Sequence, residues 1–75
     1  MEKKMTYFEF AEAYEAETAD YLAESYANGN FSQVVSLFNE LDDDGKKLAL
    51  EMIEMQYASF YVPILELLTR KAYMN

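Results

Sequence analysis

The chain has 75 residues, of which 52% are hydrophobic and 16% aromatic, and its formal net charge is −8. This apolar content excludes an intrinsically disordered acidic tail, and the length predicts one domain, residues 1–75, with a thin core. The absence of histidine, cysteine and tryptophan removes the commonest general base, the best nucleophile and the soft metal ligands. We therefore expect a protein that is not an enzyme and has no catalytic site, cofactor or metal.

The N-terminus and the apolar runs bear on location. The first residues, MEKKM, are followed by no apolar stretch of the kind that a secretory signal contains. No uninterrupted apolar run approaches the ~20 residues that span a bilayer. We therefore expect a soluble, cytoplasmic protein.

The charge is distributed unevenly along the chain. Residues 5–44 contain ten acids and no base, a charge of −10, whereas the remaining residues contain four acids and six bases. Such a chain repels nucleic acid and anionic lipid. We therefore expect a protein partner with a basic surface, no direct nucleic-acid binding and no membrane binding.

One amphipathic helix is predicted over residues 6–27. Thr6 and Glu9 have the spacing of a capping box, and Gly29 can take the left-handed conformation that closes a helix. Aromatic and small residues recur on one predicted face, where Tyr7, Tyr14 and Tyr21 are each followed four positions later by Ala11, Thr18 or Ser25. The opposite face carries the carboxylates Glu9, Glu12, Glu17, Asp20 and Glu24.

A second helix is predicted over residues 31–41. Asn30 and Gln33 have capping spacing, and apolar residues recur at helical intervals from Phe31 to Leu41. Residues 23–38, with Tyr26, Gly29 and Phe31 in order, resemble the inner half of a tetratricopeptide hairpin in a single copy. This resemblance implies a helical hairpin and no particular function.

The last part of the chain predicts helices over 44–61 and 63–73. An aspartate of the run Asp42-Asp43-Asp44 is expected to cap the first of these, and Pro63 is expected to end or kink it near Tyr61 or Val62. The aspartates are consecutive, unlike the alternating ligands of an EF-hand, so a capped turn explains them better than calcium does. Two helices or one kinked helix fit this region equally. The predicted fold class is all-α, a small three- or four-helix bundle.

The acidic residues are the best candidates for a functional surface. Like charges at helical spacing cost stability, and a surface that serves solubility alone usually mixes signs. Carboxylates three or four residues apart on a helix are ~5–6 Å apart, close to the spacing of phosphates along a nucleic-acid strand. The predicted partner-binding surface consists of Glu9, Glu12, Glu17, Asp20, Glu24, Asp42, Asp43 and Asp44.

Two functions follow from these patterns. The first is a small acidic inhibitor or modulator that occupies the nucleic-acid-binding surface of a partner, similar in kind to phage and mobile-element anti-CRISPR and anti-restriction proteins. The second is a structural or regulatory adaptor, or a homodimer, that acts through an apolar face formed by Tyr7, Tyr14, Tyr21 and Met55.

Overall fold

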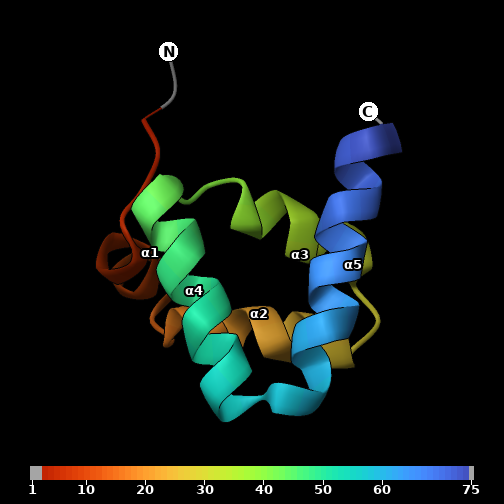
Figure 1. The fold of residues 1–75 in the computed structure, drawn as a ribbon. Coiled ribbons are helices and arrows are strands. Elements are labelled where there is room, and N and C mark those ends of the chain that lie inside the picture. Colours follow the sequence, from red (N-terminus) through yellow and green to blue (C-terminus); the bar gives the residue numbers. More distant parts are fainter. Residues whose placement is uncertain (1–2, 75) are drawn as a thin grey trace.

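The computed structural model describes residues 3–74, with side chains through Arg70, and this range contains five α-helices (Figure 1). They are α1 (Tyr7–Tyr14), α2 (Thr18–Ala27), α3 (Phe31–Phe38), α4 (Asp43–Gln56) and α5 (Ala58–Met74). The predicted all-α class is confirmed, and the predicted count of three or four helices is too low.

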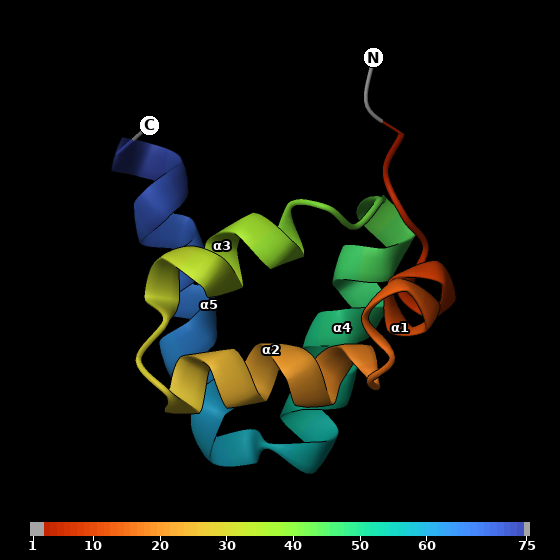
Figure 2. The same ribbon diagram turned by 180° about the vertical axis from the view of Figure 1, so that it is seen from behind.

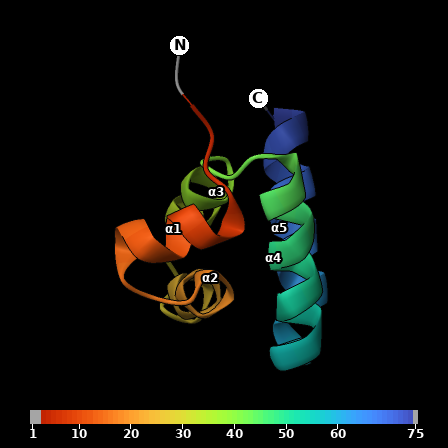
Figure 3. The same ribbon diagram turned by 90° about the vertical axis from the view of Figure 1, so that its left-hand side faces the viewer.

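The helices form two layers, which separate clearly in Figure 3. Helices α1, α2 and α3, within residues 5–41, form the N-terminal layer. Helices α4 and α5 run antiparallel and form the C-terminal hairpin. Helices α1 and α2 contact α4, and α3 contacts α5. Helices α2 and α3 pack as an antiparallel pair (Figure 2), as the short connection and the tetratricopeptide likeness predict.

The prediction of one helix over 6–27 is wrong at its centre. The capping box of Thr6 and Glu9 is present, but α1 ends at Tyr14, and the next residue, Glu15, has the left-handed backbone angles φ 55° and ψ 40°. The Glu15 and Ala16 amides both donate to the Ala11 carbonyl, so Glu15 occupies the position that glycine usually fills in a Schellman motif. A straight 22-residue helix would be about 33 Å long. The longest extent of the described Cα trace is 29 Å, so the molecule with its break at Glu15 is shorter than such a helix.

The predicted boundaries around α3 and α4 also need correction. Helix α3 ends at Phe38, and Asn30 makes no side-chain capping bond, so the predicted Asn30–Gln33 cap is absent. Helix α4 begins at Asp43, and Asp42 caps it by accepting a hydrogen bond from the Gly45 amide at 2.7 Å. A Cβ at Gly45 would lie 3.2 Å from the Tyr7 backbone nitrogen, so glycine lets α1 and α4 begin side by side.

The break in the C-terminal hairpin lies at Tyr57 and not near Pro63. Tyr57 has φ −135° and ψ 54°, and its amide donates to the Ile53 carbonyl at the end of α4. Pro63 lies inside α5. Its missing N–H removes the bond to the Ser59 carbonyl, near the start of α5, and the rest of the long helix continues beyond it. The predicted helices 44–61 and 63–73 therefore divide the chain at the wrong residue.

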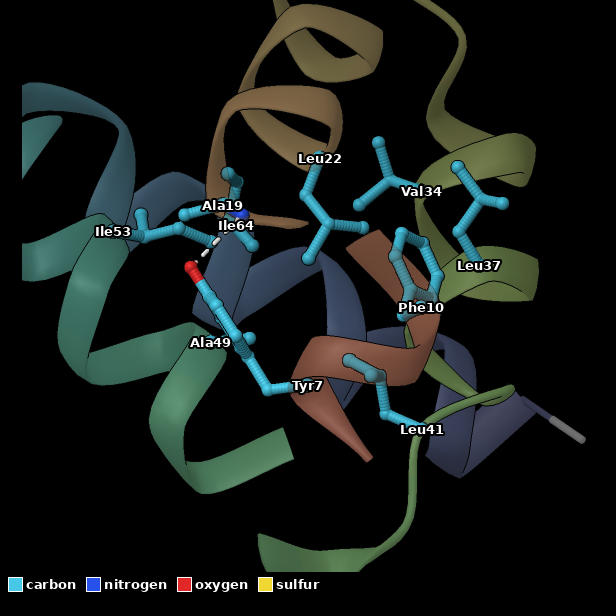
Figure 4. Packing of buried hydrophobic residues seen from close by; sticks show 10 residues of the cluster. All are labelled: Tyr7, Phe10, Ala19, Leu22, Val34, Leu37, Leu41, Ala49, Ile53 and Ile64. Atoms are coloured by element: carbon cyan, nitrogen blue, oxygen red, sulfur yellow. Dashed lines mark hydrogen bonds between the residues drawn. The ribbon is translucent and has the colours of Figure 1, made fainter. Parts of the chain in front are cut away.

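The core lies where the two layers meet (Figure 4). All five helices contribute to it, and Phe10, Leu22 and Ile53 are among its least exposed large side chains. The ten buried residues that form the core cluster are Tyr7, Phe10, Ala19, Leu22, Val34, Leu37, Leu41, Ala49, Ile53 and Ile64. No helix among the described residues combines the length and apolar character that crossing a bilayer requires.

Candidate protein-binding surface

The uneven charge of the sequence follows the division into layers. Residues 5–41, which form the N-terminal layer, contain seven acids and no base: Glu9, Glu12, Glu15, Glu17, Asp20, Glu24 and Glu40. Residues 43–74, which form the C-terminal hairpin, contain five acids and four bases. One layer is therefore uniformly acidic, whereas the other is nearly neutral.

The predicted acidic residues do not lie along one helix. The chain reversal at Glu15 separates the carboxylates of α1 from those of α2, which was expected to continue the same face. Glu9 and Glu12 lie on α1, Glu17 is the N-cap of α2, Asp20 and Glu24 lie on α2, Asp42 caps α4, and Asp43 and Asp44 form its first turn. The prediction that Glu9, Glu12, Glu17, Asp20 and Glu24 share one helical face is therefore wrong.

Half of these eight carboxylates accept hydrogen bonds within the chain. Glu9 accepts from the Thr6 amide, and Asp42 accepts from the Gly45 amide. Glu17 accepts from the Asp20 amide and from the Tyr7 hydroxyl, and Asp20 accepts from the Tyr57 hydroxyl. The other four, Glu12, Glu24, Asp43 and Asp44, are exposed. These four exposed carboxylates are the most available to a partner.

Tyrosine hydroxyls bond to carboxylates from other segments at three places. Burial and the bond to Glu17 raise the pKa of Tyr7 above its ordinary value. The Tyr14 hydroxyl donates to Glu40 at 2.6 Å, and this bond, together with burial, raises the pKa of Tyr14 to about 12. The bond to Asp20 likewise raises the pKa of Tyr57. Sequence reasoning missed these pairs, which join residues 10, 26 and 37 positions apart.

A shallow groove lies between the beginnings of α1 and α4. Its volume is about 260 Å³, and we name it the Phe8 groove because the Phe8 side chain, 72% exposed, stands at its edge. Asp42 and Asp44 are its acidic members, and its other lining residues are Thr6, Tyr7, Gly45 and Leu48. Aromatic residues, Phe among them, are enriched at protein–protein interfaces, so the exposed Phe8 ring is a candidate contact for a partner.

A second groove lies where α2 passes the corner between α4 and α5. Its volume is about 310 Å³, and we name it the Tyr57 groove. The α2 side consists of Asp20, Ala23, Glu24 and Ala27, and the corner contributes Tyr57 and Phe60. The two aromatic rings are stacked, with centroids 6.2 Å apart and planes 9° apart. Carboxylates and aromatic faces together are the groups that bind cationic side chains.

The residues predicted for an apolar face lie in different environments. Tyr7 is buried, and Tyr14 and Tyr21 are half-buried with ring centroids 5.2 Å apart. Phe10 lies 4.6 Å from Tyr14 between ring centroids, so the tyrosines extend the core across the break at Glu15. Met55 is 76% exposed at the end of α4. Met55 therefore differs in exposure from the three tyrosines.

Among the described residues, no group of three or more acidic side chains is placed to hold a metal ion. The arrangement offers two shallow grooves lined by carboxylates and aromatic rings. The chain matches no protein-family profile, no curated protein and no solved structure.

Proposed function

We propose that the protein is a non-enzymatic binding module that occupies a basic, nucleic-acid-binding surface of a partner protein. The observation that carries the proposal is the N-terminal layer, in which seven acids occur without a single base. Exposed carboxylates on this layer repel each other, so keeping them together costs stability. A basic partner surface would relieve that repulsion on binding.

The geometry supports several separate acidic sites on different helices instead of one continuous row of carboxylates. Asp20 and Glu24 lie one helical turn apart on α2, at a spacing of ~5–6 Å that approximates neighbouring phosphates. Asp43 and Asp44 lie in the first turn of α4, and Asp44 lines the Phe8 groove. The aromatic rings in both grooves add apolar contacts that phosphate mimicry alone would lack. Such a surface suits the inhibitors used by phages and mobile elements, including the anti-CRISPR and anti-restriction types.

The test is to capture partners from a lysate of the source organism on the immobilised protein and to elute them at rising salt. We expect a nucleic-acid-binding protein to elute at moderate salt, because exposed charge contacts are screened. The purified partner should then lose nucleic-acid binding when the protein is added, as measured by a gel-shift assay. A partner that stays bound at high salt, or one that keeps its nucleic-acid binding in the complex, would contradict the proposal.

Charge-reversal variants make this test specific to the N-terminal layer. We expect the double variant Glu12→Lys, Glu24→Lys to weaken partner binding by about tenfold or more, because it places cations against a basic surface. The matched control is Glu51→Lys, Glu54→Lys, which makes the same charge change at two exposed positions of α4. Equal losses in the two variants would indicate attraction by net charge without a defined acidic surface.

A second candidate is an adaptor or homodimer that acts through apolar contacts. The observation that favours it is the exposure of Met55 at 76% and Val62 at 56%. In that case Met55→Ala would abolish partner binding or dimerisation, while charge reversal at Glu12 and Glu24 would leave it intact. Sedimentation velocity of the two sets of variants distinguishes this candidate from the first.

A further inference from the structure

The Tyr57 groove has the shape and lining of a slot for one long side chain. Small residues, Ala23 and Ala27, lie on its α2 side, and the stacked rings of Tyr57 and Phe60 lie on the other. Ala23 is almost fully buried, at 2% exposure, whereas Ala27 is exposed. An extended aliphatic stem fits along the exposed Ala27 and against the aromatic rings, with the buried Ala23 forming the floor.

The charge of the groove selects the end group of that side chain. Both charged lining residues, Asp20 and Glu24, are acidic and exposed. Three carboxylates act on the Tyr57 hydroxyl, because the hydrogen bond to Asp20 and the negative charges of Asp20, Glu17 and Glu24 all raise the pKa of Tyr57. A cation entering the groove would therefore meet negative potential from several directions.

We propose that the Tyr57 groove binds an arginine side chain from a basic protein segment. The stem would lie over Ala27, and the planar guanidinium would stack on an aromatic ring and pair with Glu24. Arginine suits these groups better than lysine, because its planar fork can bond a carboxylate twice and stack on a ring at the same time. This inference rests on the proposed function, since it assigns one contact within the acidic binding module.

The experiment is a titration of the isotope-labelled full chain with nona-arginine, followed by amide chemical shifts. We expect the largest shifts at Ala23, Glu24, Ala27, Tyr57 and Phe60. Nona-lysine should bind at least about threefold more weakly, because lysine cannot form the paired and stacked contact. Shifts centred on other residues, equal affinity for the two peptides, or no binding to the folded chain would overturn the inference.

Two variants test the groove, and each has a matched control. Ala27→Leu fills the groove without changing charge, and Glu24→Gln removes one negative charge. Both should weaken nona-arginine binding by about fivefold or more. The leucine side chain would occupy the space of the arginine stem, and glutamine would lack the charge that pairs with the guanidinium. The controls are Ala13→Leu on α1 and Glu51→Gln on α4, both exposed, which should change the affinity by less than about twofold.

The outcomes separate this inference from the proposed function. If Ala27→Leu binds nona-arginine as tightly as the unchanged chain, the groove inference is wrong, while salt-dependent partner capture would still support the acidic module. If the captured partner resists high salt, the proposed function fails whatever the peptide does. Circular dichroism of every variant confirms that the helices are retained, so a loss of binding reports the groove.

Discussion

The two layers of the molecule obtain their stability in different ways. The C-terminal hairpin consists of helices of 14 and 17 residues, whereas the N-terminal layer consists of helices of 8, 10 and 8 residues. Isolated helices shorter than about 12–15 residues are marginal in water. The N-terminal layer therefore depends on tertiary contacts, and it is also the layer that carries the uniform negative charge.

Tyrosine hydroxyls take the role that basic side chains usually have beside carboxylates. Three of the seven acids in the N-terminal layer, Glu17, Asp20 and Glu40, accept a hydrogen bond from a tyrosine. A neutral donor satisfies a carboxylate without cancelling its charge. The carboxylates of the N-terminal layer can therefore accept hydrogen bonds within the protein and still keep their full negative charge.

The largest expected effect comes from removing the fully buried aromatic ring of α1. Phe10 is 0% exposed on α1, and Phe10→Ala should lower the free energy of unfolding by about 3–5 kcal/mol. The control is Phe8→Ala, two residues earlier and 72% exposed, which should change it by less than about 0.5 kcal/mol. Urea denaturation followed by circular dichroism measures both. Similar losses in the two variants would place the core elsewhere.

Alkaline pH should weaken the N-terminal layer through its tyrosines. The pKa of Tyr14 is raised to about 12, and the pKa of Tyr7 is also raised, from an ordinary value of 10.0. Between pH 10 and 12 the unfolded chain loses these protons while the folded chain keeps them, so stability falls as pH rises. The stabilising contribution is complete below pH 10. The urea midpoint should drop over this range, and the drop should be smaller in the Tyr7→Phe, Tyr14→Phe variant.

A buried hydroxyl inside the N-terminal layer gives a smaller effect. The Thr18 hydroxyl donates to the Tyr7 carbonyl at 2.7 Å and is fully buried, so it fastens α2 to the start of α1. Thr18→Val keeps the shape and removes the bond, and it should cost about 1 kcal/mol of unfolding free energy. Thr69→Val, at an exposed position on α5, is the control. A neutral result at Thr18 would mean that packing alone holds the two helices.

The smallest effect should have the opposite sign. Glu15 has φ 55°, which glycine adopts without strain, so Glu15→Gly should stabilise the protein by about 0.5–1 kcal/mol. Glu12→Gly, inside α1, should destabilise it by a similar amount. Glu15→Gln separates the relief of strain from the loss of charge. If Glu15→Gly destabilises the protein, the helix continues through residue 15, as the sequence pattern predicts.

Helix caps and turns were predictable from the sequence, whereas contacts between distant residues were not. The Thr6–Glu9 capping box, the left-handed Gly29 and an aspartate cap before α4 all follow from residues within a few positions of one another. The break at Glu15 was missed because the seven-residue recurrence of Tyr7, Tyr14 and Tyr21 continues across it. Those rings meet in the core from two helices, so the same apolar pattern fits a bent chain and a straight one.

The two grooves were beyond sequence reasoning for a related reason. The acidic residues were predictable as candidates, but Tyr57 and Phe60 were expected inside a continuous helix. The chain turns at Tyr57, where its hydroxyl also bonds Asp20, 37 residues earlier. A contact over such a separation leaves no periodic signal. Only the folded chain places the aromatic rings of the corner beside the carboxylates of α2.

A short backbone bridge between Met5 and Leu41 connects the beginning and the end of the N-terminal layer. The Met5 amide donates to the Glu40 carbonyl at 2.8 Å, and the Asp42 amide donates to the Met5 carbonyl at 2.7 Å. These bonds join the two ends of the layer across some 36 residues. Their formation is therefore opposed by the entropy lost when the whole segment is closed into a loop. Hydrogen exchange at these two amides would therefore report how often this bridge opens, separately from global unfolding.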